Sequence, residues 1–124
     1  MSDTLRFNVY VKVKEGRLED FKQIAKDWSA HHLTARPDIL SYEWFFMDED
    51  QTQAQVMEIY ESSEAMMATL KDVEESDEHT EGTDYPYEMV KTEICGKVSP
   101  ELRKMMGSGK SAVEYYSHID GFTR

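Results

Sequence analysis

The chain has 124 residues, of which 40% are hydrophobic and 31% charged, and its formal net charge is −11. This length is enough for one hydrophobic core without disulfides or bound metal. No apolar run approaches the roughly 18 residues that a membrane span needs, and clustered Lys and Arg for nucleic-acid binding are lacking. We therefore expect one globular domain over residues 1–124, with no membrane or nucleic-acid partner.

The first residues show no charged region followed by an apolar region, so they do not resemble a signal peptide, and we expect a cytoplasmic protein. The acidic segment 72–84 contains no Lys or Arg. We interpret it as a solvated connection rather than a metal cage. Cys95 is the single cysteine, and we interpret it as a small apolar residue of a strand.

The first half of the chain predicts a strand, a helix and a second strand. Residues Leu5–Val13 alternate between apolar and polar, which predicts a strand with one core face. After Gly16, apolar residues recur every three or four positions, which predicts an amphipathic helix to about Leu33. The stretch Leu40–Asp48 also predicts a strand, but it offers large apolar groups to both of its faces. Something must cover the second face.

The second half repeats this order and completes a known pattern. The pattern predicts a hairpin partner strand over Ala54–Glu61, a second helix capped by Ser62, and a fourth strand over Glu88–Val98. The fold class is therefore α+β, the ferredoxin-like split βαβ arrangement with an antiparallel sheet. Its two helices cover one sheet face, and a second copy of the chain is the expected cover for the other.

Residues 99–124 extend this core, which spans residues 1–98. Ser99 as N-cap, Pro100 at the first position and Gly107 as a stop predict a short helix. The segment 111–122, SAVEYYSHIDGF, predicts one more strand. A strand beyond the four-stranded unit is well placed to reach across to a partner copy.

The motifs VKVKEGRLEDFKQI, RPDILSYEW and MEIYESSEAMMATL resemble those of the antibiotic biosynthesis monooxygenase-like family of the dimeric α+β barrel superfamily. Three positions depart from the family pattern. Asp38 replaces a glycine, in a turn whose left-handed geometry Asp tolerates; Tyr60 replaces a tryptophan and Thr69 a helical histidine. The resemblance implies a homodimeric barrel that acts as a cofactor-independent monooxygenase on a small aromatic or polyketide-like molecule, of the quinol or anthrone type.

No nucleophile elbow, phosphate-binding loop, paired-cysteine motif or His-x-x-x-His motif occurs in the sequence. We therefore expect neither a metal site nor a cofactor. Three polar residues are candidates for catalysis. Asn8 could donate a hydrogen bond to an oxyanion, or it could be satisfied at a dimer interface. His32 could face the sheet as a general base, or it could cap the helix carbonyls.

Glu58, which shares a strand face with Tyr60, is the third catalytic candidate. Its carboxylate could act as a base if it is buried, or it could form an ion pair with Lys12 or Arg6 of the neighbouring strand. The expected substrate-binding residues are mostly aromatic. They are Tyr10, Trp28, Tyr42, Phe45 and Tyr60.

Two other functions stay open. One is a non-catalytic small-molecule-binding or stress-associated barrel. The other is heme binding and degradation, which some relatives of the family perform with an Asn, a helical Trp and a His. Asn8 and His79 lie at suggestive positions, but Thr69 stands near the place of the Trp, so we expect no tight heme binding.

Overall fold

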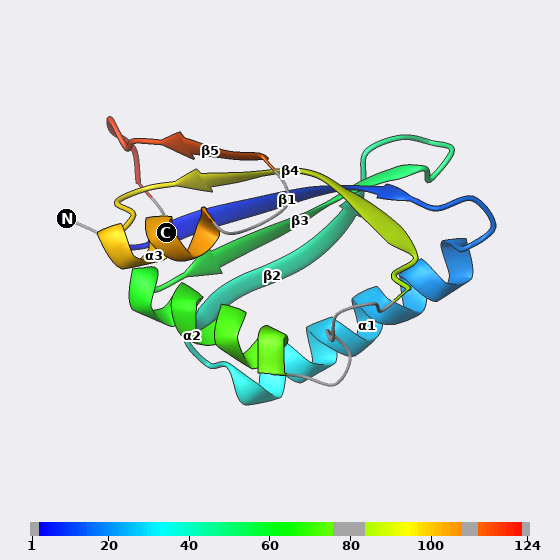
Figure 1. Cartoon of the computed structure of the whole chain (residues 1–124), viewed down its shortest axis with the longest axis horizontal. Coiled ribbons are helices and arrows are strands. Elements are labelled where there is room, and N and C mark those ends of the chain that lie inside the picture. The colour runs from blue at the N-terminus through cyan, green and yellow to red at the C-terminus, as the bar shows by residue number, and fades with distance from the viewer. Residues whose placement is uncertain (1–2, 76–83, 108–111, 123–124) are drawn as a thin grey trace.

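The computed structural model describes residues 3–75, 84–107 and 112–122 (Figure 1). Five strands and three helices follow one another along these residues. Their bounds are β1 Leu5–Val13, α1 Leu18–Ala35, β2 Ile39–Phe46, β3 Gln53–Tyr60, α2 Ser63–Glu75, β4 Tyr87–Cys95, α3 Pro100–Met106 and β5 Ala112–Tyr116. No helix among the described residues is long and apolar enough to cross a membrane.

The strands form one sheet in the order β2-β3-β1-β4-β5. Strand β1 pairs antiparallel with β3 and β4, and β2 pairs antiparallel with β3. Helices α1 and α2 lie on the same face of this sheet (Figure 1). The predicted α+β, ferredoxin-like arrangement is therefore confirmed. The fifth strand runs parallel to β4 of its own chain, so it widens the sheet at that edge.

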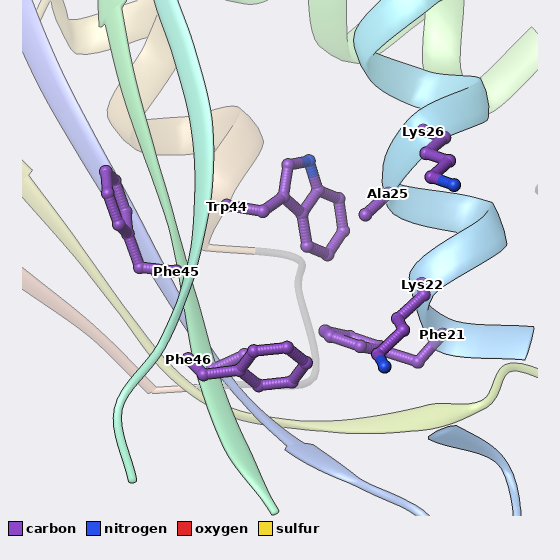
Figure 2. A pocket seen from close by; sticks show the side chains of 8 residues that line it. Phe21, Lys22, Ala25, Lys26, Trp44, Phe45 and Phe46 are labelled. Atoms are coloured by element: carbon purple, nitrogen blue, oxygen red, sulfur yellow. The ribbon is translucent and has the colours of Figure 1, made fainter. Parts of the chain in front are cut away.

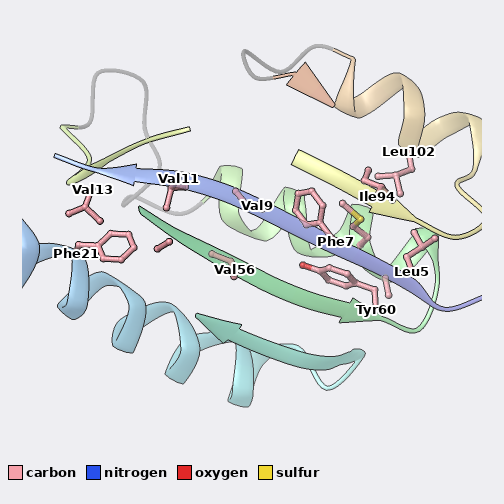
Figure 3. Packing of buried hydrophobic residues seen from close by; sticks show 13 residues of the cluster. Leu5, Phe7, Val9, Val11, Val13, Phe21, Val56, Tyr60, Ile94 and Leu102 are labelled. Atoms are coloured by element: carbon pink, nitrogen blue, oxygen red, sulfur yellow. The ribbon is translucent and has the colours of Figure 1, made fainter. Parts of the chain in front are cut away.

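The core lies between the sheet and the helices (Figure 3). Alternate residues of β1, from Leu5 to Val13, are at most 9% exposed, which follows from the period of two in a strand. Phe21 of α1 covers one end of this row, and Leu102 of α3 belongs to the same cluster. The short third helix thus adds to the main core, and its single fully buried side chain anchors the C-terminal extension.

Local signals explain where the helices begin. The Ser62 hydroxyl accepts a hydrogen bond from the Ala65 amide at 3.2 Å, and Ser99 accepts one from the Leu102 amide at 3.1 Å. Both predicted N-caps are confirmed. The turn before β2 differs from the prediction, because Asp38 is not in a left-handed conformation. Its carboxylate instead binds the Arg36 guanidinium at 2.8 Å.

The second sheet face, turned away from α1 and α2, carries exposed apolar side chains. We call this surface the outer face and the opposite surface the inner face. Large side chains of the outer face that are 39–47% exposed come from three strands. They are Phe45 of β2 with Met47 directly after it, Met57 of β3 and Tyr116 of β5. The two-sided pattern of residues 40–48 therefore has a structural cause: one side packs against α1 and the other is open.

Candidate functional site

A pocket of about 260 Å³ lies between α1 and the edge strand β2 (Figure 2). Trp44 and Phe46 of β2 point across it toward Phe21, whose ring centroid is 5.5 Å from that of Trp44 and 6.0 Å from that of Phe46. The walls are mostly apolar, and two lysines of α1 stand at its side. The lining residues are Phe21, Lys22, Ala25, Lys26, Trp44, Phe45, Phe46 and Ala54.

An unbroken row of rings leads from this pocket along the inner face. Tyr42 follows Trp44 at a centroid distance of 6.2 Å, and its ring lies 4.7 Å from that of His32 on α1. Trp28 lies one turn earlier on the helix, 5.3 Å from His32. Trp28 and His32 are both buried, 5% and 4% exposed. The α1 end of the row is therefore shielded from water, whereas Tyr42 and Trp44 on β2 are half-buried.

Glu58 lies beneath this row in the middle of β3. Its side chain is buried, and it stands opposite Tyr42 in the pairing of β2 with β3. The Tyr60 hydroxyl donates a hydrogen bond to Glu58 Oε1. Burial raises the pKa of Glu58 to about 7, although the hydrogen bond from Tyr60 opposes this rise. A carboxyl group with this pKa is half ionised near neutral pH, as a general base requires.

The tyrosines beside Glu58 are held in their protonated form. Burial first, and the negative charge of Glu58 second, raise the pKa of both Tyr42 and Tyr60. Each therefore remains a hydroxyl that can donate a hydrogen bond across the neutral pH range. Of Glu58, Tyr42 and Tyr60, Glu58 is the residue whose pKa lies near 7.

Trp44 offers a further donor between the pocket and Glu58. Its indole Nε1 is buried and makes no hydrogen bond of standard geometry among the described residues. Its weaker interaction with the Tyr42 hydroxyl works against the burial that raises the pKa of that tyrosine. A buried N–H without a full partner is costly, so an oxygen atom of a bound molecule would be a favourable acceptor.

The structure brings together five of the residues that the sequence marks as candidates: His32, Glu58, Trp28, Tyr42 and Tyr60. His32 faces the sheet, one of the two orientations considered, with its ring against Tyr42 rather than at the helix end. The alternative of an ion pair between Glu58 and Lys12 or Arg6 is wrong. Glu58 pairs with Phe7 on the inner face, whereas both cations alternate with the core residues of β1.

Three candidates lie elsewhere. Asn8 and Tyr10 alternate with the buried residues of β1 and point to the outer face. There both hydrogen-bond with Glu93, and the Tyr10 hydroxyl lies 2.5 Å from Glu93 Oε1. Figure 2 shows Phe45 on the side of β2 opposite Trp44 and Phe46. Asn8 is therefore not placed to donate to a molecule held beside Glu58 within one chain.

Sequence reasoning missed the lysines and Phe21 as pocket residues. Lys22 and Lys26 are one helical turn apart and flank Ala25, so they belong to the border between the buried and exposed faces of α1. That spacing was visible in the sequence. The lysines line this pocket because α1 packs against β2. No local sequence pattern encodes that packing.

Two positions bear on heme. His79 lies outside the described residues. Thr69 is 2% exposed, and its hydroxyl donates to the Ala65 carbonyl oxygen at 3.1 Å and accepts from Arg36 Nε at 3.3 Å. Through these two hydrogen bonds Thr69 links α2 to Arg36 at the end of α1.

Solved structures share this fold. MupZ from Pseudomonas fluorescens is 20% identical, with a TM-score of 0.79 over 100% of this chain and 91% of that one. A Bacteroides thetaiotaomicron protein of unknown function, described as a "possible oxidoreductase", is 22% identical, with a TM-score of 0.60 over 76% of this chain and 97% of that one. A Nitrosomonas europaea protein named "putative antibiotic biosynthesis monooxygenase" is 20% identical, with a TM-score of 0.54 over 81% of this chain and 95% of that one.

These similarities confirm, at the level of the fold, the resemblance to the antibiotic biosynthesis monooxygenase-like proteins. No protein-family model matches the chain, and no curated protein gives a significant match. The match to MupZ spans the whole chain, whereas the other two cover 76% and 81% of it. The extension formed by α3 and β5 is thus compatible with the fold of a solved protein.

Proposed function

We propose that the chain is a cofactor-independent monooxygenase that oxidises a small aromatic molecule of the quinol or anthrone type. The observation that carries this proposal is Glu58, a buried carboxyl group with a pKa of about 7 beside a continuous wall of aromatic rings. Direct oxidation by oxygen needs an electron-rich anion in a water-poor site. A base that is ionised only near neutral pH, in a dry aromatic environment, meets that need.

In the proposed reaction Glu58 accepts a proton from an activated CH₂ group or a phenol of the substrate. The resulting anion gives one electron to O₂, the two radicals combine into a peroxide anion, and the proton held by Glu58 returns to convert it into a hydroperoxide. Loss of water from the hydroperoxide leaves a ketone in place of the CH₂ group, so one oxygen atom enters the product and the other leaves as water. The Trp44 N–H donates to the anionic oxygen of the substrate, which lowers the energy of the charged intermediate.

The substrate enters through the pocket between α1 and β2. Trp44 stands between this pocket and Tyr42, which is the strand partner of Glu58. Rotation of the Trp44 side chain is therefore the step that admits the substrate to the base. The two pocket lysines, Lys22 and Lys26, favour a substrate that carries a phenolate or a carboxylate.

The proposed assembly is a homodimer joined through the outer face. Its exposed Phe45, Met47 and Met57 form an apolar surface of the kind that self-association covers. Asn8 and Tyr10 lie on the same face. In such a dimer they contribute to the interface, and Asn8 would act on a ligand only if one binds between the two sheets.

A non-catalytic binding protein is the second candidate, and one observation favours it. The described pocket contains no carboxylate or imidazole, so a molecule held there without movement of Trp44 would meet no base. Such a protein would bind a flat apolar anion and leave it unchanged.

Oxygen uptake with a panel of hydroquinones and anthrones, without added flavin or metal, separates these functions. We expect saturable turnover that falls by about a hundredfold in Glu58→Gln, the typical contribution of a general base. Asn8→Ala tests the alternative face. If Asn8→Ala lowers turnover as much while Glu58→Gln does not, the chemistry belongs to the outer face. If no substrate accelerates uptake but flat aromatics raise the melting temperature, the binding protein is the correct reading.

A further inference from the structure

Two adjacent histidines of α1 meet a carboxylate of α2 at the far end of the aromatic row. His31, His32 and Asp72 each offer one ligand atom, and these three atoms lie within 4.8 Å of one another. The closest pair is His31 Nε2 and Asp72 Oδ2, which are 2.8 Å apart. Nothing in the proposed oxidation uses His31 or Asp72, so this cluster is a separate feature of the molecule.

The separations are close to those of a metal site. Zinc binds His nitrogen and carboxylate oxygen at about 2.0–2.2 Å, which places neighbouring ligand atoms of a tetrahedral site about 3.3 Å apart. The His31–Asp72 pair, at 2.8 Å, is in hydrogen-bond contact and would move apart by about 0.5 Å to hold an ion between them. For the third atom, the upper limit of 4.8 Å requires an approach of about 1.5 Å at most. A small rotation of the side chains supplies such a movement.

The two imidazoles are positioned by their neighbours. Residues at i and i+1 of a helix normally point about 100° apart, yet the two rings lie 5.4 Å from each other. Trp28, three and four residues earlier, packs against both rings at 5.5 and 5.3 Å, and Tyr42 holds His32 from the sheet side at 4.7 Å. Packing on this scale reduces the entropy that the ligands lose when an ion binds.

Burial gives the cluster one closed side and one open side. His32 is 4% exposed, whereas the side chains of His31 and Asp72 are 43% and 35% exposed. An ion can therefore reach the cluster from solvent and still contact a buried ligand. Three protein ligands also leave a position for water, as in open zinc sites.

We propose that His31, His32 and Asp72 bind a divalent late first-row transition-metal ion such as Zn²⁺ between α1 and α2. Two imidazoles and one carboxylate select ions of this type over Mg²⁺ and Ca²⁺, which prefer sets of oxygen ligands. The formal charge of −11 also favours a cation. Binding would join the end of α1 to α2, and it would occupy His32 without involving Glu58.

Calorimetric titration of the full, tag-free chain with Zn²⁺ tests the site. We expect one ion per chain, and a loss of affinity of more than about a hundredfold in His31→Ala and in Asp72→Asn, because loss of even an outer-shell partner costs up to about that factor. Both positions are partly exposed, so both variants should fold. His32→Gln should have the same effect. His118→Ala, which changes an exposed histidine outside the cluster, is the matched control and should bind like the parent.

Spectroscopy identifies the ligands independently of affinity. With Cu²⁺ as the probe, hyperfine coupling to two imidazole nitrogens is expected in the parent chain and to one in His31→Ala. The acidic residues that follow Asp72 in the sequence could compete for a cation, and His79→Ala tests whether the histidine among them takes part. Absence of saturable Zn²⁺ binding, or binding that survives both His31→Ala and Asp72→Asn, would overturn the proposal and leave His31–Asp72 as a simple ion pair between helices.

Discussion

Glu58 and Tyr60 are two residues apart on β3, share its inner face, and are joined by a hydrogen bond from the tyrosine hydroxyl to the carboxyl group. The period of two in a strand places both on one face. Burial then makes each the other's nearest polar partner, so that a glutamate with a raised pKa is tolerated in the core. This pair is both a cost to the fold and the proposed source of its chemistry.

The first prediction is that Glu58→Gln makes the chain more stable at pH 8. Burial raises the pKa of Glu58 from 4.5 to about 7, so the protonated form favours the folded state. The free energy of unfolding is therefore highest below pH 4.5, the pKa of Glu58 in the unfolded chain. It falls by on the order of 3 kcal/mol as the pH rises through the pKa of Glu58 in the folded chain. Denaturant unfolding between pH 4 and pH 8 measures it.

In Glu58→Gln the fall of the free energy of unfolding between pH 4 and pH 8 should disappear. Tyr60→Phe provides the opposite change, because it removes the hydrogen bond that lowers the pKa of Glu58. The loss of stability should then extend to a higher pH. Identical pH profiles for the parent and Glu58→Gln would show that Glu58 titrates normally in the fold.

The second prediction concerns Gly96, which follows β4. It has a φ of +125°, and an added Cβ would lie 2.8 Å from the Thr4 carbonyl oxygen and 2.9 Å from Leu5 Cδ2. Gly96→Ala therefore combines backbone strain with a clash, and we expect it to lower the free energy of unfolding by about 3 kcal/mol or more. Thermal and denaturant unfolding measure the change.

Gly16 is the matched control. Its φ is +75°, but an added Cβ would meet nothing within 4 Å. Gly16→Ala should therefore cost about 1–2 kcal/mol from the backbone alone. Equal costs at the two glycines would mean that β1 yields at Thr4 and Leu5, and that the close approach to β4 is not needed for stability.

Much of the fold is predictable because its signals are local. The alternation of Leu5–Val13 marks β1 to the residue, and the serines at 62 and 99 mark the starts of two helices. The site is less predictable. Residues 56–60 of β3 carry apolar side chains on both faces, so the sequence leaves the side of Glu58 open, and a one-residue change of register would reverse it.

The pocket was missed for a different reason. It depends on contacts between α1 and β2, where Phe21 and Trp44 meet, and on the side of each element that faces the other. Local periodicity identifies the buried side of α1 but not its neighbour. Periodicity therefore predicts that Trp28 and His32 point inward, but it does not predict that Lys22 lines a pocket.

The third prediction is that Phe45→Lys weakens self-association. Phe45 is 44% exposed on the outer face, and burial of a phenylalanine contributes about 1.5–3 kcal/mol. A two-fold interface loses this contribution twice, so the dissociation constant should rise by at least about a hundredfold. Light scattering over a range of protein concentrations measures it.

Leu33→Lys controls for the added charge, since Leu33 is 83% exposed on α1 and does not belong to the outer face. It should leave association unchanged. A parent chain that stays monomeric at high concentration would contradict the proposed dimer, and equal weakening by both variants would move the interface from the sheet to the helices.

The last prediction tests the pocket with two ligands of similar shape, the anion 2-naphthoate and the neutral 2-naphthol. Both should bind against Phe21, Trp44 and Phe46, but the anion also meets Lys22 and Lys26. Replacing both lysines by Gln should weaken naphthoate by about tenfold, because each exposed charge contributes up to about 1 kcal/mol. Naphthol should be almost unaffected, and added salt should weaken only naphthoate. Fluorescence titration measures both.

Ala25→Leu is the companion variant, because it adds volume to the pocket wall without changing charge. It should weaken both ligands alike, since it competes with the ring rather than with the anionic group. If Ala25→Leu leaves both affinities unchanged, the ligands bind elsewhere, and the outer face with Asn8 and Tyr10 becomes the place to search. If the lysine variant weakens both ligands equally, the lysine stems act through apolar contact and the pocket does not select anions.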